Sequence, residues 1–258
     1  MLQDQSAVIT GGANGIGFSI AAEFLKSGVS RVLILDLGET LDLAKKTELQ
    51  ACNANAAIFY AQCDITNKQQ LEKVLRQDAV QKMGSIDILV NCAGIFDERN
   101  PARCIATNLT ALIDCSMIVI DLMTKEKAGR GGTIVNISSI AGLQEFSCGA
   151  VYCASKSGVI SFTKSVGTDQ IFELTGVKMV AICPGATETG MYSSVMAANC
   201  SFPALKQMQQ FIQNMPLQKP SSVGRAVVKI IKEGTPGSVW ISENDLISEV
   251  ERNPNNYF

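Results

Sequence analysis

Residues 6–17 read Ser6-Ala7-Val8-Ile9-Thr10-Gly11-Gly12-Ala13-Asn14-Gly15-Ile16-Gly17, a short apolar run followed by a turn that contains four glycines. The apolar run is typical of a buried strand, and the residues from Gly15 to Lys26 favour a helix. Glycines let a backbone turn sharply and approach a phosphate, whose charge is then stabilised at the N-terminus of the helix. Glycines also occur in turns that bind nothing, so this stretch indicates a phosphate site only in combination with other features.

An aspartate stands at the end of the next apolar run. Asp36 follows Gly17 by 19 residues, near the spacing of about 20 residues at which an acid accepts hydrogen bonds from the adenosine ribose of a dinucleotide. A lone acid at a strand end would be interpreted as a surface residue, but its place behind the glycine turn favours the ribose interpretation. Its carboxylate would repel a 2′-phosphate, and neither residues 12–14 nor Leu37 carries a positive charge. The sequence therefore favours NAD over NADP as the cofactor.

Short apolar runs alternate with longer mixed segments along the chain, a pattern typical of a parallel sheet with crossover helices. The pattern predicts a single α/β domain over residues 1–258, with a doubly wound Rossmann fold around a seven-stranded parallel sheet. The expected strands are Ala7–Thr10, Val32–Leu35, Ala57–Tyr60, Ile86–Val90, Thr133–Ile137, Lys178–Ile182 and Ser238–Ile241, and the expected helices are Gly15–Lys26, Lys68–Met83, Ala102–Lys127, Val151–Leu174 and Ser221–Lys232. Residues 189–219 show no strand pattern and are expected to form a small helical flap over the carboxyl edge of the sheet, where ligands bind in such folds.

Composition excludes several classes of function. The 258 residues include no histidine, which removes every Ser-His-Asp and Cys-His hydrolase mechanism. The nine cysteines are scattered without a CxxC pair, so we expect free thiols in a reducing, cytoplasmic compartment and no metal site. A net charge of −2 gives no basic surface for nucleic acid. The start of the chain lacks the segments of a signal peptide, and no uncharged apolar stretch approaches the roughly 18 residues of a membrane span, so no membrane association is expected.

Five motifs occur in an order and at spacings that match one family. They are Thr10–Gly17 (TGxxxGxG), Asn91-Cys92-Ala93-Gly94 (close to NNAG, with Cys92 at the second Asn), Asn136-Ile137-Ser138-Ser139, Tyr152-Cys153-Ala154-Ser155-Lys156 (YxxxK) and Pro184-Gly185-Ala186-Thr187-Glu188-Thr189 (PGxxxT). By these motifs the chain resembles the short-chain dehydrogenase/reductase family over nearly its whole length. The resemblance is closest to members like 15-hydroxyprostaglandin dehydrogenase and the insect alcohol dehydrogenases, and it implies an NAD-dependent oxidoreductase that acts on a secondary alcohol or its ketone. Both groups usually carry Gln three residues before the active Tyr, where this chain has Gly149 and therefore lacks a polar anchor for the substrate.

The resemblance also implies the roles of individual residues. The catalytic residues would be Asn108, Ser139, Tyr152 and Lys156, with Ser139 preferred to Ser138 because it stands 13 residues before the tyrosine, as in the family. Asn108 would hold a water that relays protons to the lysine, although a local hydrogen bond within a helix is the plainer interpretation. The residues expected to bind the cofactor are Gly11, Asn14, Gly15, Ile16, Gly17, Asp36, Asp64, Ile65, Asn91, Ala93, Gly94, Tyr152, Lys156, Pro184, Gly185, Thr187 and Thr189.

The spacing of Tyr152 and Lys156 also has a physical interpretation of its own. At i and i+4 on a helix both side chains project onto one face, and an ammonium close to a phenol favours the phenolate and lowers the pKa of the phenol from about 10. Such a tyrosine can take the proton of an alcohol as hydride leaves, or return it in the reverse reaction. In isolation, the same pair would be interpreted as a half-buried tyrosine beside a lysine that extends to solvent.

The expected flap indicates an apolar substrate. Leu205, Met208, Ile212 and Met215 repeat at helical spacing, which predicts either plain packing on the domain or a deformable lid over a hydrophobic, lipid-like or terpenoid-like substrate. Two other functions stay open: a sugar-nucleotide epimerase or dehydratase, whose chains are usually longer, and a non-catalytic binding or storage protein that retains the fold. The apolar content of the two longest expected helices predicts a homodimer.

Overall fold

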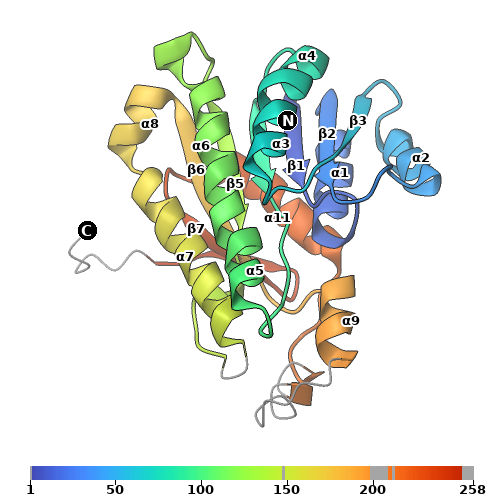
Figure 1. The fold of residues 1–258 in the computed structure, drawn as a ribbon, viewed down its shortest axis with the longest axis vertical. Coiled ribbons are helices and arrows are strands. Elements are labelled where there is room, and N and C mark those ends of the chain that lie inside the picture. Colours follow the sequence, from blue (N-terminus) through green and yellow to red (C-terminus); the bar gives the residue numbers. More distant parts are fainter. Residues whose placement is uncertain (1, 147–148, 198–208, 211–212, 252–258) are drawn as a thin grey trace.

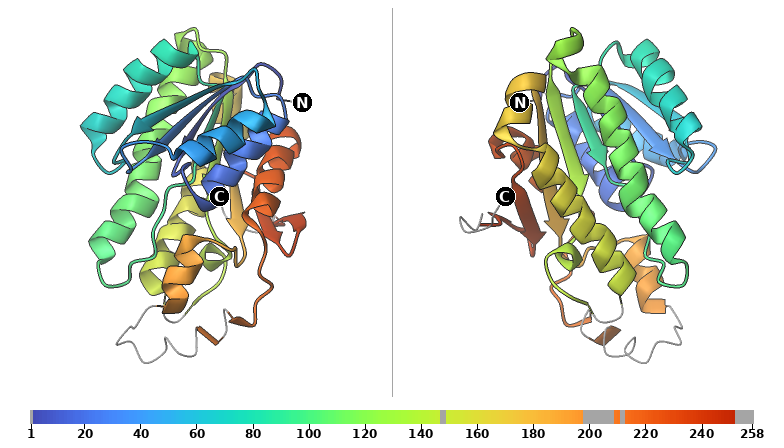
Figure 2. Two further views of the ribbon diagram at one scale, coloured as in Figure 1. Left: turned by 90° about the vertical axis from the view of Figure 1, so that its right-hand side faces the viewer. Right: turned by 60° about the vertical axis from the view of Figure 1, so that its left-hand side comes forward.

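The computed structural model describes residues 2–146, 149–197, 209–210 and 213–251. Its centre is a sheet covered by helices on both faces (Figure 1, Figure 2). The strands are β1 (Ser6–Thr10), β2 (Arg31–Asp36), β3 (Ala57–Gln62), β4 (Ile88–Asn91), β5 (Gly132–Ile137), β6 (Val177–Pro184), β7 (Val239–Glu243) and β8 (Leu246–Glu249). They lie in the order β3-β2-β1-β4-β5-β6-β7-β8, so the chain begins near the middle and winds first to one edge and then to the other. This is the doubly wound arrangement that the sequence predicts.

Two layers of helices bury the two faces of the sheet. One layer contains α1 (Gly15–Lys26), α2 (Leu43–Cys52) and α11 (Pro220–Glu233). The other contains α3 (Lys68–Lys73), η1 (Val74–Ala79), α4 (Val80–Met83), α5 (Pro101–Ile105), η2 (Ala106–Thr110), α6 (Ala111–Met123), α7 (Ala150–Val166) and α8 (Asp169–Thr175), with the single turns η3 (Lys125–Lys127) and η4 (Ile140–Gly142) beside them. Ile9 and Ile34 pack toward the first layer, whereas Val8 and Leu33 pack toward the second. Because both faces are buried, the strands appear in the sequence as continuous apolar runs.

The parallel register brings the sequence motifs to one edge of the sheet. Thr10 pairs with Asn91, and Asn91 pairs with Asn136. These residues end, or nearly end, their strands, so the glycine turn, residues 92–94 and residues 138–139 leave the sheet side by side. Parallel strands place all their carboxyl ends at the same edge, which is where ligands bind in open α/β sheets.

The sheet has eight strands and is mixed, whereas the sequence predicts seven parallel strands. The additional strand, β8, runs antiparallel to β7. The two are joined by Asn244 and Asp245, whose φ angles are positive, at 50° and 59°. Positive φ at both central residues is the requirement of a type I′ hairpin turn, and asparagine and aspartate tolerate it. This pair is the sequence signal for the hairpin, because β8 is short, largely exposed and lacks an apolar run.

Two helical regions also differ from the expected ones. The helix α2 begins after Asp42, whose side chain caps it, but its sequence is too polar to show an apolar stripe and was not expected to be a helix. The expected helix Val151–Leu174 is divided into α7 and α8. Gly167 follows the end of α7, and the side chain of Thr168 caps α8 by accepting a hydrogen bond from a backbone N–H of its first turn.

Part of the expected flap lies within the described residues. The helix α9 (Gly190–Ala197) follows the end of β6, and its Val195 is buried. Of the expected apolar stripe, Met215 is partly buried, whereas Leu205, Met208 and Ile212 lie outside the described residues. The idea of an apolar lid therefore stays a prediction for most of its length.

One helical run, Pro101–Met123, is long and apolar enough to cross a membrane by length and composition alone, with a mean hydropathy of 1.6. Core helices of α/β domains pass the same test, although only 39% of the most apolar window of this run is buried inside the fold. Its charged side chains, Arg103, Asp114 and Asp121, form ion pairs with other segments. The run packs on β4 and β5 and carries the fully buried Asn108, so we interpret it as a core helix of the α/β domain.

We expect Asn244→Ala to lower the free energy of unfolding by about 1 kcal/mol, because alanine tolerates positive φ less well than asparagine. Asn244→Gly should leave stability unchanged or raise it, since glycine adopts this conformation freely. Urea denaturation followed by circular dichroism measures both variants. Equal losses in the two variants would show that the Asn244 side chain, and not its backbone angle, stabilises the hairpin.

Candidate active site

A cavity of about 940 Å³ opens at the carboxyl edge of the sheet. This volume lies in the upper part of the range of ligand sites, about 300–1,000 Å³. Most of the predicted site residues line it: Gly11, Asn14, Gly15, Ile16, Gly17, Asp36, Asp64, Ile65, Ala93, Gly94, Ser139, Tyr152, Lys156, Pro184, Gly185, Thr187 and Thr189. Asn91 and Asn108 are the exceptions, since both are buried and neither contributes to the cavity lining.

The glycine turn has a conformation that only glycine fits. Gly11 has a φ of +66°, and a Cβ atom there would lie 2.7 Å from Cα of Ala93. A Cβ atom on Gly17, in the first turn of α1, would lie 2.3 Å from the carbonyl oxygen of Gly11. The side chain of Asn14 makes no capping hydrogen bond to α1, so the N–H groups of the first turn remain available to an anion. The turn therefore fits the diphosphate of a dinucleotide.

Charged groups from β2 and α2 flank this turn. The carboxylate of Asp36 accepts hydrogen bonds from the N–H groups of Ala13, at 3.0 Å, and Leu37, at 2.8 Å. Lys45 donates from Nζ to the carbonyl oxygen of Ala13 at 2.9 Å and to the side-chain oxygen of Asn14. Lys45 therefore adds a positive charge at the glycine turn, although residues 12–14 and Leu37 are uncharged as the sequence indicates. No local signal marks Lys45, because the contact depends on where α2 packs.

Asn91 belongs to a buried polar network and not to the cavity wall, which corrects its predicted contact with the cofactor. Its Nδ2 donates to Oγ of Ser116 and to Oδ1 of Asn136, both at 2.8 Å. Nδ2 of Asn136 donates in turn to Oγ1 of Thr163 at 2.9 Å. The network joins β4 and β5 to α6 and α7, so Asn91 acts on the site by aligning the strands that carry it.

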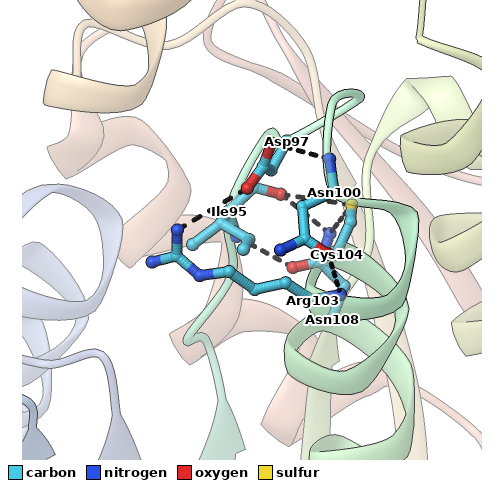
Figure 3. A network of polar contacts seen from close by, with 6 residues as sticks. All are labelled: Ile95, Asp97, Asn100, Arg103, Cys104 and Asn108. Carbon is cyan, nitrogen blue, oxygen red and sulfur yellow. Dashed lines mark hydrogen bonds and ion pairs between the residues drawn. The ribbon is translucent and has the colours of Figure 1, made fainter.

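Asn108 pairs with the backbone of Ile95 in the loop that follows β4 (Figure 3). Its Nδ2 donates to the carbonyl oxygen of Ile95 and its Oδ1 accepts from the N–H of Ile95, both at 2.8 Å. Nδ2 also lies 3.1 Å from Oγ of Ser155 on α7. Asn108 sits in η2, a π-helical turn of the kind that is frequent at functional sites. Both polar atoms of the side chain are therefore engaged, and the side chain positions the loop and α7. The water-holding role of Asn108 stays a prediction.

Ser139, Tyr152 and Lys156 meet at the cavity. Oγ of Ser139 accepts a hydrogen bond from the N–H of Ala141 at 3.1 Å, and the Ser139 side chain acts to lower the pKa of the Tyr152 hydroxyl. Tyr152 and Lys156 lie one turn apart on α7, and Nζ of Lys156 is 5.6 Å from the centre of the tyrosine ring. This Nζ donates to the carbonyl oxygen of Ile137 at 2.9 Å. The neighbouring Ser138 has a different partner, because its Oγ donates to the carbonyl oxygen of Lys156 at 2.9 Å.

Known proteins resemble this chain in sequence and in fold. A family model described as short chain dehydrogenase matches residues 5–199. The chain belongs to this family. It is 32% identical to alcohol dehydrogenase 2 of Ceratitis cosyra over 96% of this chain and 95% of that protein. It is 35% identical to the NAD(+) 15-hydroxyprostaglandin dehydrogenase of Homo sapiens over 73% of this chain and 70% of that protein. The crystal structure of levodione reductase has a TM-score of 0.79 at 22% identity, covering 94% of this chain and 97% of that one, and it supports the fold. The predicted resemblance to both groups of relatives is confirmed.

Burial dominates the ionisation of the central pair in this short-chain dehydrogenase. Burial raises the pKa of Tyr152 to about 12, although the neighbouring Ser139 side chain opposes the rise. Burial lowers the pKa of Lys156 from 10.5 to about 8. The predicted lowering of the tyrosine pKa by the lysine is therefore wrong for this structure, because withdrawing a phenolate from water outweighs the attraction of the ammonium. At pH 7 the tyrosine is protonated and the lysine carries a positive charge.

The arrangement can move a proton to and from a substrate oxygen. The hydroxyls of Ser139 and Tyr152 both line the cavity and can hydrogen-bond to one oxygen atom. In this position Tyr152 can donate its proton to a ketone oxygen, or accept the proton of an alcohol through the phenolate. Ser139 can stabilise negative charge that develops on the same oxygen. When bound, a nicotinamide cofactor supplies or accepts the hydride. The positive charge of Lys156 favours the phenolate side of the exchange.

Glu98 is a positioning residue for which the sequence carries no signal. The helix α7 begins after Gly149, which has no side chain to cap it. The carboxylate of Glu98 takes this role, since it accepts hydrogen bonds from the N–H groups of Val151 at 3.0 Å and Tyr152 at 2.8 Å. Phe96, from the same loop, packs against the Tyr152 ring with 5.3 Å between centroids. The loop after β4 thus holds the tyrosine by both its backbone and its ring.

We expect Ser139→Ala to lower kcat by about 100-fold or more, the usual effect of removing one donor to a developing negative charge. Ser138→Ala should lower kcat by less than about tenfold, because the Oγ of Ser138 donates to the backbone carbonyl of Lys156 in α7. Initial rates at saturating cofactor compare the two variants, with circular dichroism as the control for folding. A larger loss in Ser138→Ala would assign the catalytic hydroxyl to Ser138.

The lowered pKa of Lys156 should make stability depend on pH. The folded chain releases this proton near pH 8 and the unfolded chain near pH 10.5, so between these values the unfolded state binds more protons and stability rises with pH. Relative to Lys156→Met, which has no such proton, the wild type should gain about 2 kcal/mol of unfolding free energy from pH 8 to pH 10. Urea denaturation across this range measures the difference. A difference that does not change with pH would show that Lys156 keeps its ordinary pKa.

Proposed function

We propose that this short-chain dehydrogenase uses NAD to transfer a hydride to or from a secondary alcohol or its ketone, with a hydrophobic substrate body. The observation that carries the proposal is the placement of the Ser139 and Tyr152 hydroxyls in the same cavity as the glycine turn and Asp36. A proton donor and a dinucleotide cradle in one cavity suit hydride transfer coupled to proton transfer. Relatives named alcohol dehydrogenase and 15-hydroxyprostaglandin dehydrogenase support the same class of reaction.

Support for NAD comes from the end of the cavity at β2. The carboxylate of Asp36 stands at the glycine turn, where it suits ribose hydroxyls and repels a 2′-phosphate. Lys45 moderates this preference without reversing it, because its ammonium is engaged by Ala13 and Asn14. The human relative is itself named for NAD(+).

Support for a hydrophobic substrate comes from the cavity lining. Its apolar and aromatic members include Phe96, Phe146, Cys153, Met191, Tyr192, Val195 and Met215. A Cβ atom at Gly149 would lie 3.2 Å from the ring of Phe96, so the position that lacks a polar anchor adjoins an aromatic ring. Binding then comes mainly from buried apolar area, at about 25 cal/mol per Å².

We further propose a homodimer in a reducing, cytoplasmic compartment. The helical run Pro101–Met123 is apolar, yet only 39% of its most apolar window is buried within the chain, and its Met117 is 51% exposed. A second copy packed on this run would cover such a surface. The cysteines within the described residues are all free, which fits a reducing compartment.

A non-catalytic binding protein is the alternative function. Binding alone does not require a serine, a tyrosine and a lysine to meet at the cavity, and Ser139, Tyr152 and Lys156 all do so. The site therefore favours the enzyme.

Catalytic efficiency with NAD should rise from propan-2-ol to octan-2-ol, by up to about fourfold per added methylene, because each contributes up to about 0.8 kcal/mol when buried. The absorbance of NADH follows the rates, with NADP as the comparison cofactor. Met191→Ala should flatten the rise because Met191 lines the cavity. Met196→Ala is the matched control, since Met196 lies on the same helix outside the cavity lining.

Tyr152→Phe tests the chemistry in the same assay. The variant lacks only the acid–base oxygen, so it should lose nearly all turnover and still bind NADH. Equal efficiencies with NAD and NADP would contradict the cofactor assignment, and highest efficiency with the smallest alcohol would contradict the apolar site. A wild type that binds NADH but converts no alcohol or ketone would favour the binding protein.

A further inference from the structure

Arg103 stands in the first turns of α5 and lines the cavity, and Figure 3 shows its side chain extended away from the helix toward Asp97. The position of this helix start is fixed by two hydrogen bonds. Oδ1 of Asn100 accepts from the N–H of Arg103 at 3.1 Å, and the N–H of Asn100 donates to Oδ1 of Asp97 at 3.2 Å. The loop after β4 therefore determines where the guanidinium reaches the cavity.

The guanidinium of Arg103 is held only loosely. Its Nη1 lies 3.6 Å from Oδ2 of Asp97, and the side chain is 62% exposed. The distance is longer than a hydrogen bond, and an exposed pair of this kind contributes little to stability. A guanidinium has five N–H donors, so Arg103 can exchange Asp97 for a better acceptor at little cost.

The charges around the cavity leave an anionic ligand with few partners. The charged residues of the described lining are two acids, Asp36 and Asp64, and two basic residues, Lys156 and Arg103. Lys156 is buried and donates to the carbonyl oxygen of Ile137. Arg103 is therefore the exposed cation of the described lining, and a ligand with two negative charges would attract it.

We propose that Arg103 binds the diphosphate of the dinucleotide cofactor, an inference that rests on the proposed NAD-dependent function. The glycine turn and the N-terminus of α1 offer backbone N–H groups from one wall of the cavity. Arg103 adds a cation from the wall formed by the loop after β4 and α5. A guanidinium suits this role because two parallel N–H groups match two phosphate oxygens. On binding, the guanidinium exchanges Asp97 for the diphosphate, while Asp97 keeps its hydrogen bond to Asn100.

Three ligands distinguish the contribution of the diphosphate to binding from that of the rest of the cofactor. NADH and ADP-ribose contain it, and adenosine lacks it; fluorescence titration gives the Kd of NADH, and competition gives the other two. Arg103→Gln should raise the Kd values of NADH and ADP-ribose about tenfold at low salt. The Kd of adenosine should stay within about twofold of its wild-type value. The affinity of Arg103→Lys for NADH and ADP-ribose should lie between the affinities of Arg103→Gln and the wild type. The loss of affinity in Arg103→Gln should be smaller at high salt. Arg99→Gln is the matched control: this exposed neighbour lies outside the cavity lining and should bind all three ligands like the wild type.

Unchanged affinity of Arg103→Gln for NADH and ADP-ribose would overturn the proposal. An equal loss for adenosine would also overturn it, because the variant would then have distorted the cavity. If the variant instead loses only a preference for a hydroxy acid over its methyl ester, Arg103 binds a substrate carboxylate and the diphosphate assignment is wrong. A wild type that binds no NADH would refute the proposed function, which is a separate result.

Discussion

The register of β1, β4 and β5 is the constraint on which the site depends. The side-chain hydrogen bond between Asn91 and Asn136, at 2.8 Å, aligns β4 with β5 inside the core. Oγ1 of Thr10 accepts from the N–H groups of Cys92 and Ala93 at 3.1 and 3.2 Å, and so aligns β1 with the segment after β4. A slip of one residue would turn every side chain of a strand to the opposite face and separate the glycine turn from Ala93. A slipped register would leave these buried polar groups without partners, and each such group costs about 1–3 kcal/mol of stability. Polar contacts therefore specify the register of the strands together with apolar packing.

Much of the fold can be predicted because its signals are local. A strand buried on both faces is an apolar run, and the motifs that follow the strands predict most of the cavity lining. The remainder depends on contacts between segments that are distant in the sequence. Lys45 reaches Asn14 because α2 packs beside α1, and Glu98 caps α7 from the loop after β4. Neither contact leaves a pattern near the residue itself, and β8 depends on two turn residues where the other strands depend on apolar runs.

Residue type and spacing do not determine how a side chain is oriented or how deeply it is buried. Asn91 and Asn108 occupy the expected positions, yet their amides bond to the protein core and to the loop after β4. The i, i+4 spacing of Tyr152 and Lys156 indicates proximity, but the depth of burial decides which effect on the pKa wins. The protonated tyrosine is ready to donate to a ketone oxygen. Oxidation of an alcohol requires the pKa of Tyr152 to fall. A positive charge or hydrogen-bond donors brought into the cavity would lower the pKa of this tyrosine.

The loop after β4 connects the two halves of the site. Asn108 holds the loop at Ile95, and the adjacent acids Asp97 and Glu98 act on different helices. Asp97 contacts the start of α5 and its Arg103, whereas Glu98 holds the start of α7 at Tyr152. Only one peptide bond separates the two acids, so one short segment holds both helix starts. A ligand that engages Arg103 therefore contacts the same short segment that orients Tyr152. Such a ligand stabilises the arrangement of that segment to which it binds more tightly.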